Sequence, residues 1–529
     1  MSTYFKKPVL ITALCVAFGG LMAVSTAYAT DHGDTALVNG ANRTDARLTD
    51  YFALNRGKML ALIIDTNPTL GTPGQITAQH PDQPKPQTQT EYIFPTDVKF
   101  SASIDNHSAV DFNDPVRNAQ HGGTVRTPAD IKENFTFTFT FDSANKPTVT
   151  MSSLDTELGI SGFYPTEVNQ GELVYVLGSG FNSEETKVKV NGRRAPFSKV
   201  LSDNVLVFIA PFGGKTGAIS ISTETEDEAT DTETKAKVTS ASELKINKFK
   251  GFNPDAIQNL KDIVSNTAAL DLIKAGNVAG LAQIGLPVKT FSGLRDDPFI
   301  RLPQQGKNVA AMAVELPQSL FTHGRQKVLL SWSTTSHATV AGPVADVAGR
   351  SFATMFSPEQ LAGLDATGVS IKNPDGTNKY PSLNAIHPSL HVSTLEAKEA
   401  DAPVAGTLNR NSFLLPCQTP FQPFSAVQSQ TLATLVIDCA PGQRMLKTPD
   451  VIIFDTTKAQ AFPNGRDLDN DQIDYIGSIF DPRVENLRRG EMNVPANPLD
   501  NHGVPFVLSP SANDVPHDAN FPYLGLPQI

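Results

Sequence analysis

The chain has 529 residues, 40% of them hydrophobic, and a formal net charge of −11. This length and hydrophobic content allow more than one core, and the negative charge argues against nucleic acid and anionic membranes as partners. A protein or a small ligand is therefore the expected partner.

The N-terminus has the order of a secretory signal peptide. Lys6 and Lys7 precede a mostly apolar stretch, and Ala-Tyr-Ala at 27–29 is a cleavage site of small residues. We expect residues 1–29 to be removed and the mature protein to be exported, either periplasmic or extracellular. The alternative is a membrane anchor, but the apolar stretch is short for a bilayer span, and we expect no integral membrane span after cleavage.

Strand patterns recur along the chain and favour a mainly β fold. Residues 60–64 form a short apolar run, and residues 135–141 alternate Phe and Thr with the two-residue period of a strand. Apolar runs at 328–332 and 451–454 predict two further strands. Between residues 255 and 286 the apolar period becomes helical, which predicts a short helical insertion.

A small module interrupts the larger domain. In residues 157–223, Gly and Pro separate several short apolar strands, a pattern typical of a β-sandwich. The segments ISGFYPTEVNQGELVYVLGSGF, VKVNGRRAP and VLVFIAPFGGKTGAISIS resemble the immunoglobulin-like TIG (IPT) domain, which implies a packing or interaction module. Residues 224–244 are acidic and poor in large apolar side chains, so we expect an exposed linker. The larger β-rich domain is then discontinuous, with residues 30–156 and 245–529.

The mature chain keeps two cysteines, Cys417 and Cys439. In an oxidising compartment such a pair predicts a structural disulfide. The closed loop of about 20 residues would stabilise the fold by roughly 3 kcal/mol through lost chain entropy in the unfolded state. A redox pair is the alternative, but the CxxC spacing is missing.

The segments that flank the small module share a second resemblance. They contain, in order, Asp31-His32-Gly33-Asp34, Thr49-Asp50-Tyr51-Phe52, the Gly-x-Arg-Asp-Asp-Pro-Phe of 293–299, the Trp-x-Thr-Thr of 332–335, the run from Phe462 to Asp474, and Phe521 to Pro527. Together these resemble an uncharacterised family of exported bacterial proteins, domain-of-unknown-function family 4331. Gln528 stands where that family usually has His. The resemblance implies export and brings no established activity.

Acidic side chains are the candidate cation ligands. Asp469, Asp471 and Asp474 follow a Pro-Asn-Gly turn, and carboxylates at alternate positions suit Ca²⁺. An EF-hand is rejected because the required Gly and terminal Glu are missing. The full candidate set for calcium or another divalent cation is Asp469, Asp471, Asp474, Asp296, Asp297 and His32. The alternative is structural, with Arg466 and Arg295 each bracing a charged loop by pairing with neighbouring carboxylates.

Three functions fit these patterns. The preferred one is a non-enzymatic binding or scaffold protein, stabilised by a divalent cation. The second is a metal-dependent periplasmic hydrolase that uses Asp296, Asp297, Asp471 and Asp474. The third is a cell-surface interaction protein that acts through the TIG-like module. The sequence has no Gly-x-Ser-x-Gly, His-Glu-x-x-His or Walker A motif, and so gives no direct sign of a catalytic centre.

Overall fold

The computed structural model describes residues 44–70, 92–108, 110–111, 124–125, 131–181, 185–227, 232–247, 254–298, 308–322, 327–337, 344–349, 451–458, 460, 465–468 and 515–528. As predicted, the fold is mainly β, with mostly antiparallel sheets and few helices. Within these residues no helix combines the length and the apolar character needed to cross a membrane.

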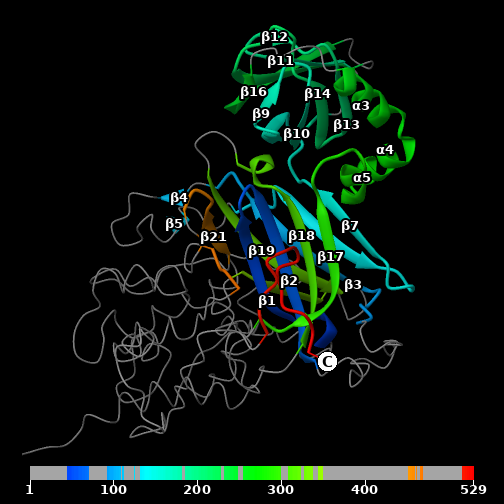
Figure 1. The fold of residues 1–529 in the computed structure, drawn as a ribbon, viewed down its shortest axis with the longest axis vertical. Coiled ribbons are helices and arrows are strands. Elements are labelled where there is room, and N and C mark those ends of the chain that lie inside the picture. The colour runs from blue at the N-terminus through cyan, green and yellow to red at the C-terminus, as the bar shows by residue number, and fades with distance from the viewer. Residues whose placement is uncertain are drawn as a thin grey trace, which may run out of the picture.

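The larger domain contains two sheets that pack face to face (Figure 1). The first sheet has the order β1-β2-β18-β17. Its strands are β1 (Leu48–Arg56), β2 (Met59–Leu70), β18 (Asn308–Pro317) and β17 (Lys289–Asp296). The second sheet has the order β20-β19-β3-β6-β7, and β21 also pairs with β19. Its strands are β20 (Val344–Ala348), β19 (Val328–His337), β3 (Val98–Asp105), β6 (Phe135–Phe141), β7 (Pro147–Ser152) and β21 (Ile452–Asp455). A short pair, β4 (Val110–Asp111) and β5 (Thr124–Val125), lies apart from both.

The alternation of residues 135–141 explains one half of this core. In β6 every Phe is buried and every Thr is half-buried, as the two-residue period predicts. Each buried Phe stabilises the fold by about 1.5–3 kcal/mol. From the first sheet, Tyr51 reaches across the core, and its hydroxyl lies 2.5 Å from the hydroxyl of Ser331 on β19. Burial raises the pKa of Tyr51 above its ordinary value, so this phenol stays neutral.

The small module is a sandwich of two further sheets, drawn at the top of Figure 1. The first has the order β13-β14-β10-β8, and the second has the order β12-β11-β15-β16-β9. The strands are β8 (Gly159–Tyr164), β9 (Glu167–Asn169), β10 (Leu173–Ser179), β11 (Glu185–Val190), β12 (Arg193–Arg194), β13 (Ser198–Ser202), β14 (Val205–Ile209), β15 (Gly217–Asp227) and β16 (Thr232–Asn247). Its own core holds Phe163, Phe181, Phe208 and Ile221.

The linker expected at 224–244 is not a linker. This segment belongs to the β15–β16 hairpin, in which Glu224 pairs with Lys235 and the sandwich extends to Asn247. Its composition is misleading because a strand of a sandwich needs one apolar face only. Leu244 supplies buried apolar surface, and opposite charges on facing strands add cross-strand stabilisation.

Three short helices confirm the predicted helical insertion: α3 (Pro254–Ser265), α4 (Thr267–Lys274) and α5 (Val278–Gln283). The first two lie along β14 and β13 of the small sandwich. Asn266 caps α4, because its side chain accepts a 3.1 Å hydrogen bond from the backbone N–H of Ala269. Figure 1 shows α5 beside β7. Because the apolar side chains of these helices belong to the same core as both bodies, the two bodies share one continuous core. A short 3-10 helix, η1 (Thr44–Ala46), precedes β1, and a second, η5 (Gln318–Leu320), follows β18.

Candidate functional site

The outer face of the first sheet is covered by segments from much later in the chain. Its apolar side chains pack against Leu468, Tyr523 and Leu524. Figure 1 shows the C-terminal segment, in red, lying over β2 and β18. Four sequence pieces that are far apart in the chain therefore come together here: the Thr-Asp piece of β1, the Arg-Asp-Asp piece of β17, the Gly-Arg turn at 465–466 and the segment from Phe521.

Arg466 is the centre of this arrangement beside the middle of β1, the edge strand of the sheet. Its guanidinium forms a buried ion pair with Asp50 on β1 and lies 4.3 Å from the ring centroid of Phe52. The side chain of Gln460 holds the turn, donating to the carbonyl oxygens of Ala53 at 2.6 Å and Arg466 at 2.7 Å. Arg466 thus braces its turn against a strand that is distant in the sequence. The sequence pattern predicts instead that Arg466 pairs with the aspartates that follow it.

Burial dominates the electrostatics of the Asp50–Arg466 pair. Asp50 is 1% exposed, and desolvation raises its pKa to about 6 although the charge and the hydrogen bond of Arg466 lower it. Among the described residues, Oδ2 of Asp50 has no hydrogen-bond partner. One guanidinium therefore holds this carboxylate away from water. In such a place either charge without its partner would lower the free energy of unfolding.

A second set of contacts holds the end of the sheet at the β1–β2 turn. Arg56 forms a 2.7 Å ion pair with Asp467 and lies 5.3 Å from the ring centroid of Tyr523. The hydroxyl of Tyr523 donates a hydrogen bond to the buried carboxylate of Glu315, which also forms a 2.7 Å ion pair with Lys289. Burial first, and then the hydrogen bond and charge of Glu315, raise the pKa of Tyr523 above its ordinary value.

Sequence reasoning missed this second set of contacts. One signal was present, because Glu315 is the single acidic residue in the otherwise apolar strand β18. A carboxylate in such a strand needs a polar partner when it is buried. Nothing in the sequence identifies Tyr523 as that partner, since the two residues are 208 positions apart.

The other end of the sheet holds the Arg-Asp-Asp piece. Asp296 is fully buried, and its Oδ1 accepts a 2.9 Å hydrogen bond from the side-chain amide of Gln528. The backbone N–H of Gln528 donates to Asn308 at 2.8 Å, and the side chain of Asn308 donates back at 3.1 Å. Gln528 thus joins the C-terminal segment to β17 and β18.

Arg295 does not form the expected pair with its neighbouring carboxylates. Its guanidinium carbon lies 4.0 Å from the ring centroid of Phe291, and Nη1 donates to the carbonyl of Leu294 at 2.9 Å. Burial lowers the pKa of Arg295, and the charge of Asp518 opposes that shift. Because β17 alternates its side chains, Arg295 and Phe291 share one face of the strand, and the aromatic ring takes the position expected for a carboxylate.

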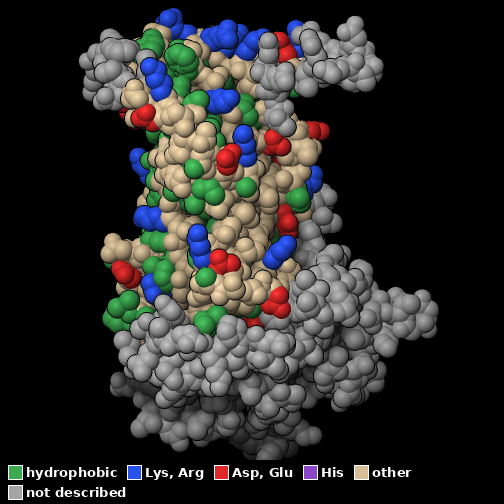
Figure 2. Space-filling view, turned by 90° about the vertical axis from the view of Figure 1, so that its right-hand side faces the viewer, with side chains coloured by type: hydrophobic (Ala, Val, Ile, Leu, Met, Phe, Trp, Pro, Cys, Tyr) green, Lys and Arg blue, Asp and Glu red, His purple; other side chains and the backbone are tan. Residues whose placement is uncertain are grey.

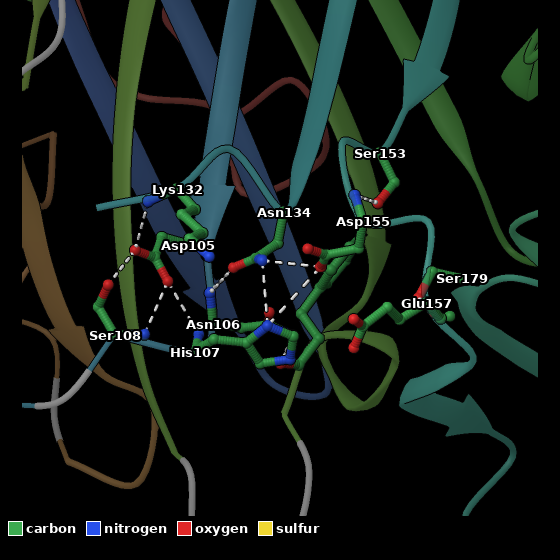
Figure 3. A network of polar contacts seen from close by, with 12 residues as sticks. Asp105, Asn106, His107, Ser108, Lys132, Asn134, Ser153, Asp155, Glu157 and Ser179 are labelled. Carbon is green, nitrogen blue, oxygen red and sulfur yellow. Dashed lines mark hydrogen bonds and ion pairs between the residues drawn. The ribbon is translucent and has the colours of Figure 1, made fainter. Parts of the chain in front are cut away.

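A separate polar network lies at the end of β3, close to the small sandwich (Figure 3). Oδ1 of Asp105 accepts hydrogen bonds from the backbone N–H groups of His107 at 2.8 Å and Ser108 at 2.9 Å. Its Oδ2 accepts a hydrogen bond from the backbone N–H of Lys132 at 3.0 Å. Figure 3 shows Asn134 between His107 and Asp155, with hydrogen bonds of 3.0 and 2.9 Å. The network ties three loops together. Sequence patterns do not predict this network, because its members come from segments without a common motif.

Several predicted ligands lie outside the described residues. They are His32, Asp469, Asp471 and Asp474, and the predicted disulfide of Cys417 and Cys439 also lies outside them. Asp297 is described and is 1% exposed. Within the part of the chain that the structure describes, no group of three or more His, Cys, Asp or Glu side chains could hold a metal ion.

Residues 158–237 match the model of the IPT/TIG domain family. No curated protein matches the chain. Among solved structures, the chain is similar to an auxiliary nutrient binding protein from Bacteroides ovatus, with 20% identity, 18% of this chain and 21% of that chain covered, and a TM-score of 0.15. A putative phosphatase from Bacteroides thetaiotaomicron has 22% identity, coverages of 20% and 19%, and a TM-score of 0.15. A gamma-CGTase from alkalophilic Bacillus clarkii has 10% identity, coverages of 57% and 36%, and a TM-score of 0.14. The chain thus spans about a fifth of the length of the first two.

Proposed function

We propose that the protein is an exported bacterial binding or scaffold protein, in which the larger β domain is a rigid support for the TIG module. The observation that carries this proposal is the buried junction between the two. A module on a flexible linker can turn in any direction, whereas a module fixed by buried contacts presents one surface in one direction.

Three contacts make this junction specific. The hydroxyl of Tyr175 on β10 donates a 2.6 Å hydrogen bond to the carbonyl of Ile284, which follows α5. Ser319 in η5 donates at 2.8 Å to the carbonyl of Phe163 on β8. Gly162 packs so closely on η5 that a Cβ there would lie 2.1 Å from the carbonyl oxygen of Ser319. The geometry therefore favours a fixed presentation of the module.

Other observations support export and binding. The order of charged, apolar and small residues at the N-terminus is that of a cleaved signal. TIG domains are mostly packing and interaction modules, and this chain has one at residues 158–237. The convergence of separate sequence pieces on one sheet face is what the resemblance to family 4331 implies, because pieces of one family domain should form one unit.

A bound divalent cation is part of the proposal as a stabilising ion. Its candidate ligands are Asp296 and Asp297, which are buried, and the aspartates at 469, 471 and 474. Elemental analysis of the purified mature protein tests this, together with melting curves with and without a chelator. Since a ligand of the native state stabilises it by mass action, removal of the ion should lower the melting temperature. The absence of metal and an unchanged melting temperature would remove the ion from the proposal.

The binding role is tested by sedimentation of the mature protein with washed envelope material from a bacterium that produces it. We expect the protein to sediment with this material and hydrogen exchange to slow on the TIG module. Absence of both effects contradicts the binding role, and the hydrolase alternative then needs evidence of its own. In that case a chelator would abolish a hydrolytic activity of the purified protein, Asp296→Asn would remove it, and no envelope binding would be seen.

A further inference from the structure

The TIG module presents one sheet face that is rich in cations and hydroxyl groups. On β11, Val188 and Val190 point into the core, so Lys187 and Lys189 point outward. The register places Arg194 and Ser220 beside Lys189, and it places Ser222 between Lys187 and Lys237. We name this surface the cationic face and define it by Lys187, Lys189, Arg194, Lys235, Lys237, Ser220, Ser222 and Thr239.

Some of these charges are balanced locally and others are not. Glu224 is shared by Lys187 at 3.0 Å and Lys235 at 3.9 Å. Within the described residues, Lys189, Arg194 and Lys237 take part in no salt bridge. The register pairs Glu185 with Glu224 and Glu226 with Glu233 farther along the same strands, so the positive surplus is confined to the end with Lys189, Arg194 and Lys237. Figure 2 shows Lys and Arg side chains gathered along the top of the molecule, where Figure 1 places β11 and β12.

The spacing of the cations suits an extended partner. Alternate residues on one strand are about 7 Å apart, and neighbouring strands are about 4.8 Å apart. Lys187 and Lys189 therefore lie about 7 Å apart along β11, and Lys237 lies two strands away, at about 10 Å. A linear chain with regularly repeated anionic groups can contact several of these cations at once, and the hydroxyl groups between them suit hydrogen bonds to sugar hydroxyls.

The chemistry of the face favours a glycan over a protein or a membrane. Protein interfaces depend on buried aromatic or apolar anchors, and membrane docking uses apolar side chains that enter the lipid. The large apolar side chains exposed in the described part of the chain are Leu154, Phe197, Val264 and Leu526, and none belongs to the cationic face. Lysine-rich patches bind acidic glycans through charge, so aromatic platforms are not required.

We propose that the cationic face binds a linear acidic polysaccharide with carboxylate or sulfate groups. This inference rests on the proposed binding function and names the class of ligand. Lys189, Lys237 and Arg194 contact the anionic groups, while Ser220 and Ser222 contact hydroxyl groups of the sugars. Because the contacts are exposed and electrostatic, binding weakens as ionic strength rises.

The test uses the full mature chain with heparin and polygalacturonate as probes and neutral dextran as a negative control. Calorimetry or biolayer interferometry at several salt concentrations measures the affinity. The double variant Lys189→Glu/Lys237→Glu should bind roughly tenfold or more weakly, because it loses two charge-assisted contacts. Its salt dependence should also be flatter. The control Lys261→Glu/Lys274→Glu changes the net charge equally on exposed positions of α3 and α4 and should bind as the wild type does.

The other outcomes are distinct. Equal loss in both double variants would show that net charge matters and the face does not. Binding to anionic vesicles without binding to either polysaccharide would identify a membrane partner and overturn the inference. A concentration-dependent dimer that Lys189→Glu/Lys237→Glu abolishes would identify a second copy as the partner. If envelope material binds the protein and neither polysaccharide does, the inference fails and the proposed function stands. If nothing binds, both fail.

Discussion

Arg466 and Asp50 are 416 positions apart in the sequence and form an ion pair on the buried outer face of the first sheet. The pair joins the Gly-Arg turn to β1, the first strand of the chain that the structure describes. Because both side chains are almost fully buried, the ion pair stabilises the fold little more than two well-packed apolar side chains would. Loss of one partner, however, leaves a buried charge without compensation.

Removal of Arg466 should therefore destabilise the protein strongly. Arg466→Ala leaves the carboxylate of Asp50 buried without its cation and should lower the free energy of unfolding by about 3–5 kcal/mol. The matched control is Arg56→Ala. It breaks the partly exposed ion pair with Asp467 and should cost about 1 kcal/mol or less for the pair itself. Urea unfolding of both variants gives the comparison, and equal losses would contradict the burial argument.

The pKa of Asp50 gives the fold a pH dependence of known sign. Burial raises this pKa from 3.8 to about 6, so the folded state binds more protons than the unfolded state between these values. The stability that the raised pKa of Asp50 contributes is fully present below about pH 4 and is lost as the pH rises through about 6. Relative to Asp50→Asn, the wild type should lose on the order of 2–3 kcal/mol across this range. Unfolding free energies of both proteins from pH 4 to 7 measure it. A difference that stays flat or grows with pH would contradict it.

Tyr523→Phe tests the attachment of the C-terminal segment. The change removes the hydroxyl that donates to Glu315, a carboxylate that is 1% exposed, and should cost about 1–3 kcal/mol. Glu315 keeps its ion pair with Lys289, so the sheet itself should remain intact. Limited proteolysis should therefore cut the 515–528 segment faster in the variant. The control is Glu315→Gln, which retains a hydrogen-bonding side chain. Unchanged proteolysis in Tyr523→Phe would show that the apolar contacts alone hold the segment.

Gly162→Ala tests the junction between the module and the larger domain. A Cβ at this position would lie 2.1 Å from the backbone of η5, so one of the two bodies must move. The control on the same strand is Gly159→Ala, where the nearest atom is the hydroxyl oxygen of Ser179 at 3.0 Å and can rotate away. We expect faster hydrogen exchange in β8 and η5 and a lower melting temperature for Gly162→Ala only. Equal effects of the two variants would count against a rigid junction.

The spacing of apolar residues predicts the strands and helices of this fold in the segments where either the strand period or the helical period dominates. The Phe-Thr alternation of residues 135–141 matches β6 along its full length. The change to a helical period at 255–286 corresponds to three helices instead of a simple hairpin. For residues 224–244 composition predicts a linker, whereas the cross-strand partners of β15 and β16 make this segment part of a hairpin.

The candidate site was less predictable, for a physical reason. The sequence identified Arg466 as a brace, but the choice of Asp50 as its partner depends on how the sheet face is covered. Arg295 was expected to pair with a carboxylate and instead lies against Phe291, because strand alternation places these two on the same face. Charged residues pair with the groups that the tertiary structure brings near them. The local sequence therefore shows which charged residues are present and does not predict their partners.

The covering of the first sheet by residues 465–468 and 515–528 also bears on biogenesis. A chain made from its N-terminus exposes β1 and β2 long before these segments are synthesised. Until then the outer face of the sheet, with Phe52, Leu54 and Ile63, has no cover and can associate with other chains. The outer face of the first sheet can therefore be covered only after these later segments have been made.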